Sequence, residues 1–230
     1  MPKKQENFTL LDGRVTMAPS LYNPTSDAVW LAAFVPSNVK TVLDVGIGSG
    51  GVSLCLLQHI SNAHIKGIDI SEEMLSACRK NIELNNCNDR ICVSNTDIFN
   101  WSTTELFDAV ITNPPYFQGT PAKHNAHHNT DITQWTKKSL ARVKSNGFFC
   151  TIVDTQVADK VIAVLCDKHL GDIKIFPLFS TKNSAERVLI RGRKGVSTGT
   201  TIYRGSPMNN DQILRSGLTI ESLLTTLESL

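Results

Sequence analysis

Asn113 is followed by Pro114, Pro115, Tyr116 and Phe117, a stretch that combines hydrogen-bond acceptors with a flat aromatic ring. Proline keeps the preceding residue out of the helical conformation and stiffens the loop, so the Asn113 amide is held in place. The Asn113 side-chain oxygen and the Pro114 carbonyl can both accept from one planar NH₂ group, while Tyr116 can stack on the attached ring. Two acceptors favour a pyramidal nitrogen with its lone pair free to attack. The pattern therefore indicates chemistry at an exocyclic amine, by alignment and charge stabilisation rather than by a general base.

A second chemical motif is the glycine-rich turn that follows the apolar run Thr41–Val45. Glycines at a strand end permit a sharp turn and close approach of a ligand, and the N-terminus of the next helix would present free N–H groups to it. Gly46, Gly48 and Gly51 also satisfy the dinucleotide-binding fingerprint, so NAD is an alternative ligand. Asp69, at the end of the next strand, can accept from ribose hydroxyls, which NAD shares with S-adenosylmethionine. Asn113 to Tyr116, which we call the amine clamp, favour S-adenosylmethionine over NAD, because hydride transfer has no use for a group that binds an amine.

The expected cofactor residues extend beyond the glycines. Asp97 follows a third strand and is placed to accept from an adenine amine, with Ile98 packing on the ring; a simple loop cap is the alternative for Asp97. The full set of expected cofactor-binding residues is Asp44, Gly46, Gly48, Gly50, Asp69, Ile70, Asp97, Ile98 and Asn113.

The elements that would position these residues are seven apolar segments with the character of strands. They are Thr41–Val45, His64–Asp69, Ile91–Val93, Leu106–Thr112, Gly147–Val153, Asp172–Leu178 and Ala185–Arg191. Separated by helical segments, they predict a doubly wound α/β fold: a mostly parallel seven-stranded sheet of order 3-2-1-4-5-7-6, antiparallel at the last-numbered edge. Helices are expected over 28–34, capped by Ser26 or Asp27, after the glycine turn, from Ser71 onward, and over 131–144, 155–169 and 219–230, with a hairpin over 10–17. We expect one domain over 1–230, with 1–27 as an N-terminal extension and 196–230 as a tail.

Composition limits the classes of protein. The chain has 230 residues, 41% of them hydrophobic, and a net charge of +2. A signal peptide and a membrane-length apolar run are both missing from the sequence, and six cysteines without a C-x-x-C pair suit buried thiols in a reducing cytoplasm. His124, His127 and His128 lie in a polar loop without accompanying acids or cysteines, so a solvated loop is a better interpretation than a metal site. We expect a cytoplasmic protein with no metal and no membrane partner, most simply a monomer.

Residues 180–215 form a basic stretch that contains seven Lys and Arg residues and only two acidic residues. Arg187, Arg191, Arg193 and Lys194 would contribute phosphate contacts, and strand alternation puts 187, 191 and 193 on one face. Together with Phe117 they are the expected RNA-binding residues. The alternative is a solvated edge strand protected by charge.

The chain resembles the bacterial tRNA1(Val) (adenine(37)-N6)-methyltransferase family nearly end to end. The resemblance is carried by residues 11–15, 22–36, the glycine turn, Asn113 to Phe117 and 187–195. It implies one class I methyltransferase domain, S-adenosylmethionine as methyl donor, and the N6 amine of an adenine in tRNA as target. In class I methyltransferases the segment before the first helix also covers the methionine end of the cofactor. Glutamine methylation of a release factor is the alternative reaction, and a catalytically silent RNA-binding module the alternative of another class.

Overall fold

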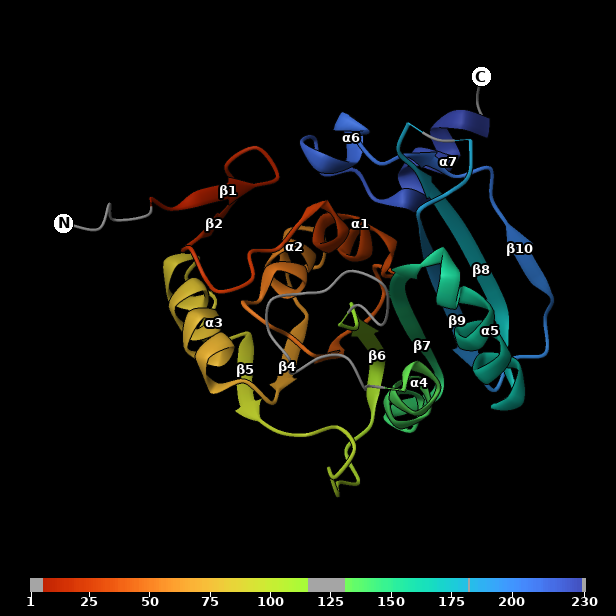
Figure 1. Cartoon of the computed structure of the whole chain (residues 1–230), viewed down its shortest axis with the longest axis horizontal. Coiled ribbons are helices and arrows are strands. Elements are labelled where there is room, and N and C mark those ends of the chain that lie inside the picture. Colours follow the sequence, from red (N-terminus) through yellow and green to blue (C-terminus); the bar gives the residue numbers. More distant parts are fainter. Residues whose placement is uncertain (1–5, 116–130, 182, 229–230) are drawn as a thin grey trace.

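The computed structural model describes residues 6–115, 131–181 and 183–228. Its centre is one large sheet with the strand order β10-β8-β9-β7-β6-β3-β4-β5, to which β11 adds by pairing with β8 (Figure 1). The strands are β3 Thr41–Val45, β4 His64–Asp69, β5 Ile91–Asn95, β6 Phe107–Thr112, β7 Val143–Asp154, β8 Leu170–Phe179, β9 Arg187–Lys194, β10 Thr200–Ile202 and β11 Ser206–Pro207.

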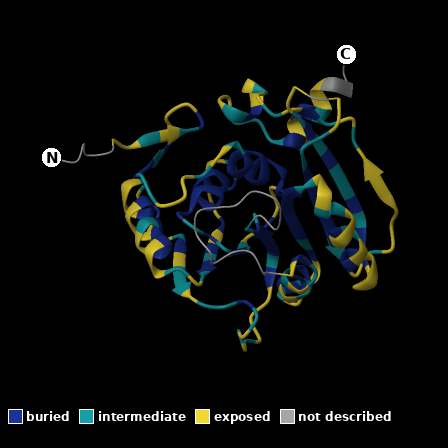
Figure 2. Ribbon diagram, in the orientation of Figure 1, coloured by how far each residue is buried: buried dark blue, intermediate teal, exposed yellow. Residues whose placement is uncertain are grey.

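The predicted order of the seven main strands is confirmed. β9 is antiparallel to both of its neighbours, β7 and β8, and the remaining pairs are parallel. The short strands β10 and β11 were not predicted; both run parallel to β8 and bring the sheet to nine strands. Every residue of β10 is exposed, so it carries no alternating apolar pattern that could reveal it (Figure 2).

Helices cover both faces of the sheet. The first cluster of buried residues joins it to α1 Ser26–Phe34, α2 Gly51–His59 and α3 Glu72–Leu84. The second joins it to α4 Ile132–Leu140 and α5 Ala158–Asp167, which follows the 3₁₀ turn Thr155–Val157. Two helices close the described chain, α6 Asp211–Leu214 and α7 Ile220–Glu228, and both pack on α1.

Two helix ends differ from expectation. Thr25, rather than Ser26 or Asp27, caps α1, since its hydroxyl accepts from the Asp27 N–H at 3.4 Å. The helix expected to reach Lys144 ends at Leu140, and Val143 already pairs with Phe107 of β6. The pairing of β7 with β6 overrides the helical preference of this short segment.

α1 is buried on all sides, from Asp27 to Phe34 (Figure 2). It lies between the sheet, α2, α6 and α7, and Trp30 is its largest fully buried side chain. This explains why α1 is apolar all round instead of amphipathic.

The expected N-terminal hairpin is present as β1 Phe8–Leu10 and β2 Val15–Met17. Two asparagines hold it, Asn81 of α3 and Asn85, which caps the end of that helix. Asn85 exchanges hydrogen bonds with both backbone groups of Thr16, and the Asn81 amide oxygen accepts from the Ala18 N–H at 2.7 Å. Asn81 also donates to the Ser49 carbonyl at 2.9 Å. The hairpin is thereby tied to the glycine turn. Among the described residues, no helix is long and apolar enough to span a membrane.

Candidate active site

The glycine turn lies at the carboxyl end of β3. The N–H groups of Gly46 and Ile47 both donate to the Ile68 carbonyl of β4, at 2.8 and 3.0 Å. Gly48 and Gly50 have φ values of 55° and 89°, in the left-handed region that favours glycine. Gly50 begins α2 without a side-chain cap, so the first N–H groups of that helix keep their capacity for a ligand.

Asp69 joins the glycine turn to the start of α3. One carboxylate oxygen accepts from the Gly48 N–H and the other from the Ser71 N–H, each at 2.9 Å. A carboxylate oxygen can accept more than one hydrogen bond, so both oxygens retain capacity toward a ligand. The neighbouring Ile70 is 63% exposed, an unusual value for isoleucine, and it offers an apolar platform beside the carboxylate.

Asp44 lies beneath the turn, fully buried, and its carboxylate accepts from the Ser53 hydroxyl at 2.6 Å. Burial raises the pKa of Asp44 to about 7; the hydrogen bond from Ser53 opposes the shift and the charge of Asp69 adds to it. A carboxyl group that titrates near neutrality is therefore built into the floor of the site.

Asp97 caps its own loop in the structure. Its two carboxylate oxygens accept from the Phe99 N–H at 2.9 Å and from the Asn100 amide at 2.6 Å. Ile98 is 5% exposed and packs within the second core cluster. The local cap is thus observed, and the adenine-binding role of both residues stays a prediction.

The clamp begins where β6 ends. β6 pairs with β3, so Asn113 and Gly46 leave the same edge of the sheet from neighbouring strands. Pro114 is buried while Asn113 is partly exposed, and within the described residues the Asn113 side chain has no hydrogen-bond partner. Within that part of the chain, its amide is therefore available to a ligand. Tyr116, Phe117 and the three loop histidines lie outside the described residues.

Thr112, directly before the clamp, is tied to three elements. Its hydroxyl donates to the Val45 carbonyl at 2.8 Å and accepts from the Trp135 indole at 3.0 Å. Its carbonyl accepts from the Thr151 hydroxyl of β7 at 2.9 Å. From the sequence, Trp135 could be identified only as an apolar residue of a helix, because nothing in the helical spacing shows that its ring lies against Gly46.

The sequence comparison decides the family. The model of the methyltransferase small domain family matches residues 26–174, from the start of α1 into β8. The chain belongs to this family. It is 28% identical over 144 residues to the tRNA1(Val) (adenine(37)-N6)-methyltransferase of Glaesserella parasuis, covering 60% of this chain and 61% of that protein. It is 31% identical over 145 residues to the Escherichia coli O157:H7 protein of the same name, covering 58% and 59%. The matches thus span about three fifths of these relatives.

Solved structures share the methyltransferase fold. A predicted O-methyltransferase from Agrobacterium tumefaciens matches with a TM-score of 0.64 at 24% identity, covering 79% of this chain and 86% of that one. The N-methyltransferase NodS from Bradyrhizobium japonicum, solved with S-adenosyl-L-homocysteine, matches with a TM-score of 0.54 at 17% identity, covering 73% and 83%. At these identities the likeness establishes the α/β methyltransferase fold alone.

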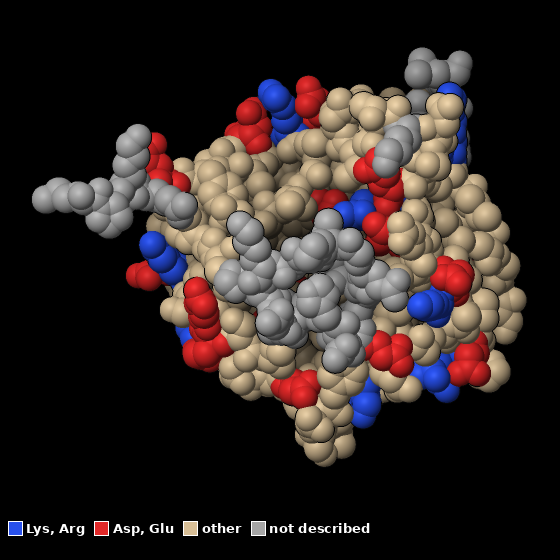
Figure 3. Space-filling model, viewed as in Figure 1, with Lys and Arg blue, Asp and Glu red and all other residues tan. Residues whose placement is uncertain are grey.

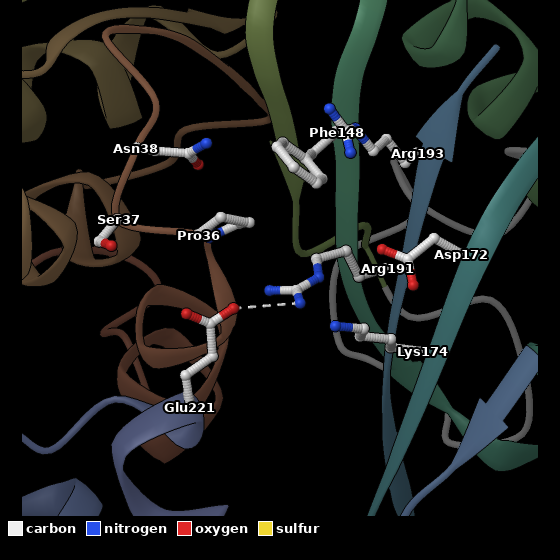
Figure 4. A pocket seen from close by; sticks show the side chains of 9 residues that line it. All are labelled: Pro36, Ser37, Asn38, Phe148, Asp172, Lys174, Arg191, Arg193 and Glu221. Carbon is white, nitrogen blue, oxygen red and sulfur yellow. Dashed lines mark hydrogen bonds and ion pairs between the residues drawn. The ribbon is translucent and has the colours of Figure 1, made fainter. Parts of the chain in front are cut away.

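The basic strand β9 of this methyltransferase family member differs from expectation. Arg191 is 3% exposed, donates to the Phe34 carbonyl at 2.9 Å and pairs with Glu221 of α7 at 3.2 Å (Figure 4). Its guanidinium stacks over the rings of Phe34 and Phe148. The expected face is correct, but α1 and α7 cover it. Arg191 therefore holds the fold together and is not an exposed phosphate contact.

The other three basic residues also have protein partners. Arg187 lies at the edge that carries the clamp and pairs with Asp27 at 3.3 Å and Asp154 at 2.9 Å. Arg193 donates to the Asn146 carbonyl and Lys194 to the Val143 carbonyl, at the opposite end of β9. Both are partly exposed. The four basic residues thus lie along β9, from Arg187 at the end beside the clamp to Arg193 and Lys194 at the opposite end.

Beside Arg191 is an open pocket of about 270 Å³, at the edge of the sheet opposite the clamp. Figure 4 shows Lys174 and Arg193 on one side of it and Glu221 on the other. Its lining residues are Pro36, Ser37, Asn38, Phe148, Asp172, Lys174, Arg191, Arg193 and Glu221. On the face shown in Figure 3, acidic and basic side chains are interspersed around a hollow lined mainly by uncharged atoms.

The structure can be compared with the composition at the cysteines and at the side chains that could bind a metal ion. Cys92 and Cys166 are exposed, so only four of the six cysteines, Cys55, Cys78, Cys87 and Cys150, are the buried thiols expected. In the described part of the chain, no three His, Cys, Asp or Glu side chains gather where they could hold a metal ion.

Proposed function

We propose that this protein transfers a methyl group from S-adenosylmethionine to the exocyclic N6 amine of an adenine in tRNA. The observation that carries the proposal is the Asn113 amide, which has no side-chain hydrogen-bond partner among the described residues and is followed by two prolines at the strand end beside the glycine turn. The names of the curated relatives support the same reaction and substrate. A tRNA substrate would place the protein in the cytoplasm, and one chain carries every residue that the proposal uses.

The residues of the glycine turn fit the proposed cofactor. Gly46, Gly48 and Gly50 have positive φ values and no side chains, so the turn that they form allows close approach of a ligand. Asp69 keeps acceptor capacity for ribose hydroxyls. Ile70 offers an exposed apolar surface for the adenine ring, near the proposed contacts of Asp97 and Ile98. When bound, the cofactor supplies an electrophilic methyl group on a positively charged sulfur.

At the clamp, Asn113 and the Pro114 carbonyl would accept the two hydrogens of the target amine. This orients the nitrogen lone pair toward the methyl group and stabilises the positive charge that develops on nitrogen. Tyr116 would stack on the base and Phe117 would extend that apolar contact. Because an amine that has accepted a methyl group loses its extra proton readily to water, the residues need only align the reactants.

Phosphate contacts remain part of the proposal for Arg193 and Lys194. Both are partly exposed and bind backbone carbonyls through one N–H group each, which leaves other N–H groups for phosphate. Arg187 is nearer the clamp, and because it pairs with Asp27 and Asp154, its proposed role is to orient these two carboxylates as well as to contact RNA.

The deciding experiment offers unmodified tRNA and release factor separately, each with radiolabelled S-adenosylmethionine. We expect label in tRNA, at the N6 position of adenine by nucleoside analysis. Label in protein and not in RNA would favour glutamine methylation, and no label in either would favour a silent binding module.

The same assay tests the clamp. Asn113→Ala removes one of two acceptors, so single-turnover methylation at saturating cofactor should slow about a hundredfold or more. Asn38→Ala, an exposed amide at the opposite edge of the sheet, is the matched control and should react as the wild type. If Asn113→Ala reacts at the wild-type rate, the amine-clamp mechanism is wrong.

A further inference from the structure

Trp135 is held rigidly at the start of α4. Asp131 caps this helix by accepting from the Thr133 N–H at 2.8 Å, and the Trp135 N–H donates to the Asp131 carbonyl at 2.8 Å. The indole meets the ring of Phe99 edge to face, with centroids 6.0 Å apart and an interplanar angle of 66°. Such a contact fixes the orientation of a large ring.

The polar edge of this ring connects to both motifs of the site. The Trp135 indole N–H donates to the Thr112 hydroxyl at 3.0 Å, and that hydroxyl donates to the Val45 carbonyl at 2.8 Å. Thr112 is the last residue of β6 before Asn113, and Val45 is the last residue of β3 before Gly46. One chain of two hydrogen bonds therefore joins α4 to the strand ends that carry the clamp and the glycine turn.

The apolar edge of the ring lies against the glycine turn itself. A Cβ atom placed on Gly46 would lie 3.3 Å from Cζ2 of Trp135 and 3.4 Å from Cη2, tighter than most contacts of a real Cβ. The φ of Gly46 is 75°. The indole thus forms one wall of the turn and at the same time donates to Thr112.

We propose that Trp135 is a positioning residue for the methyl transfer, fixing the distance between the clamp and the cofactor turn; this rests on the function proposed above. The proposal differs from a purely structural role. Without the indole N–H, Thr112 keeps its bonds to Val45 and Thr151, so the strands stay paired. What is lost is the third support that sets where Asn113 lies relative to Gly46. A small displacement there slows transfer strongly, because the reacting atoms must be aligned.

Trp135→Phe keeps an aromatic ring and removes the N–H. We expect its single-turnover rate at saturating cofactor and RNA to fall about tenfold, with cofactor affinity changed by less than about threefold. Trp101→Phe is the matched control, since Trp101 lies between Lys66 and Arg142, and it should react as the wild type. A wild-type rate for Trp135→Phe, with or without a lower melting temperature, would overturn the proposal.

Two changes at Thr112 test the same chain from its other end. Thr112→Ser keeps the hydroxyl and should react as the wild type, whereas Thr112→Val removes its bonds to both Val45 and Trp135 and should slow transfer at least as much as Trp135→Phe does. Adding Trp135→Phe to Thr112→Val should cost little more than Thr112→Val alone, because the connection between the two residues is already broken. Fully multiplicative losses would show that Trp135 acts independently of Thr112 and would reject the chain.

A fluorescence measurement separates this proposal from the proposed function. The chain has three tryptophans, and only Trp135 lies against the glycine turn. Titration with S-adenosylmethionine should change the emission of the wild type and of Trp101→Phe, and leave that of Trp135→Phe unchanged. If tRNA accepts no methyl group, the proposed substrate fails while this signal still reports Trp135 at the cofactor turn. A signal that persists in Trp135→Phe would overturn the placement.

Discussion

Asp69 is the residue at which the glycine turn and α3 converge. Its two oxygens accept from N–H groups on opposite sides, so the carboxylate is oriented before a ligand arrives. An oriented acceptor loses little conformational freedom on binding, which favours affinity. The same two bonds make Asp69 part of the local fold.

Asp69→Ala should weaken binding of S-adenosylmethionine tenfold to a hundredfold, about 1.5–3 kcal/mol, by removing a charged acceptor. Calorimetric titration measures the affinity, and thermal melting shows how much of the loss is structural. Asp89→Ala, which removes a carboxylate that is 81% exposed, is the control and should bind normally. Unchanged affinity in Asp69→Ala would refute the ribose assignment.

Asp44 makes stability depend on pH near neutrality. Burial raises the pKa of its carboxyl from 3.8 to about 7, so between these values the folded state binds a proton that the unfolded state has released. The free energy of unfolding therefore falls as pH rises, by about 2 kcal/mol between pH 5 and pH 7, and levels off above pH 7.

Asp44→Asn should lack this fall, because an amide does not titrate and can still accept from Ser53. Urea unfolding at pH 5, 6, 7 and 8 gives both profiles, and groups common to both proteins cancel in the difference. Parallel profiles would show that Asp44 has an ordinary pKa in the folded protein.

The sequence predicts the type of each site residue better than its partners. Glycines with positive φ and the acid Asp69 follow from local rules, and the structure places them at one sheet edge. Trp135 and Thr112 could not be found in this way, since a helix position 23 residues after a threonine carries no sign of a hydrogen bond. The prediction of a phosphate contact for Arg191 failed for a related reason. Strand alternation shows which face of β9 the side chain lies on, but not which helices cover that face.

At the scale of elements, Arg191 connects three segments that are distant in sequence. From β9 it reaches the last residue of α1 and the first turn of α7. The strand order was predictable because buried parallel strands are marked by apolar runs and joined by helices of ordinary length. β10 and the end of α4 were not, because pairing with a neighbouring strand, rather than local composition, determines them.

Arg191→Met keeps most of the side-chain volume and leaves the Phe34 carbonyl without this donor, so the protein should lose about 1–3 kcal/mol of stability. The control is Glu221→Gln, which removes the charge of a partner that is 55% exposed and should cost less than about 1 kcal/mol. Denaturant titration compares both with the wild type. Equal stability of Arg191→Met and wild type would mean that the buried guanidinium contributes nothing to holding α1.

At the scale of the whole molecule, the proposed tRNA substrate would lie on a surface of mixed charge. The net charge is only +2, so attraction must come from local arrangement. Arg193 and Lys194 lie at the end of β9 away from the clamp, and their contribution would mean that RNA follows the sheet from one edge to the other.

Arg193→Ala combined with Lys194→Ala should weaken tRNA binding and flatten the slope of log K against log salt by about 1.5, two phosphate contacts being lost. Arg79→Ala with Lys80→Ala removes the same charge from α3, beyond the other end of the sheet, and is the control. Identical slopes for both double variants would limit RNA to the clamp edge.

The N-terminal part of the described chain, including α1, makes hydrogen bonds with residues that are synthesised much later. The Trp30 indole donates to the Met208 carbonyl, 178 residues on, and the Arg14 guanidinium donates to the Arg215 carbonyl, 201 residues on. At a synthesis rate of 5–20 residues per second, roughly 10–40 s separate such partners on the ribosome. Throughout that time the part of α1 that packs on α6 and α7 lacks these two partners, while α2 and the sheet strands that it also contacts are made earlier. The helix that is buried on every side in the finished protein therefore keeps an uncovered apolar face during synthesis, of the kind that chaperones bind.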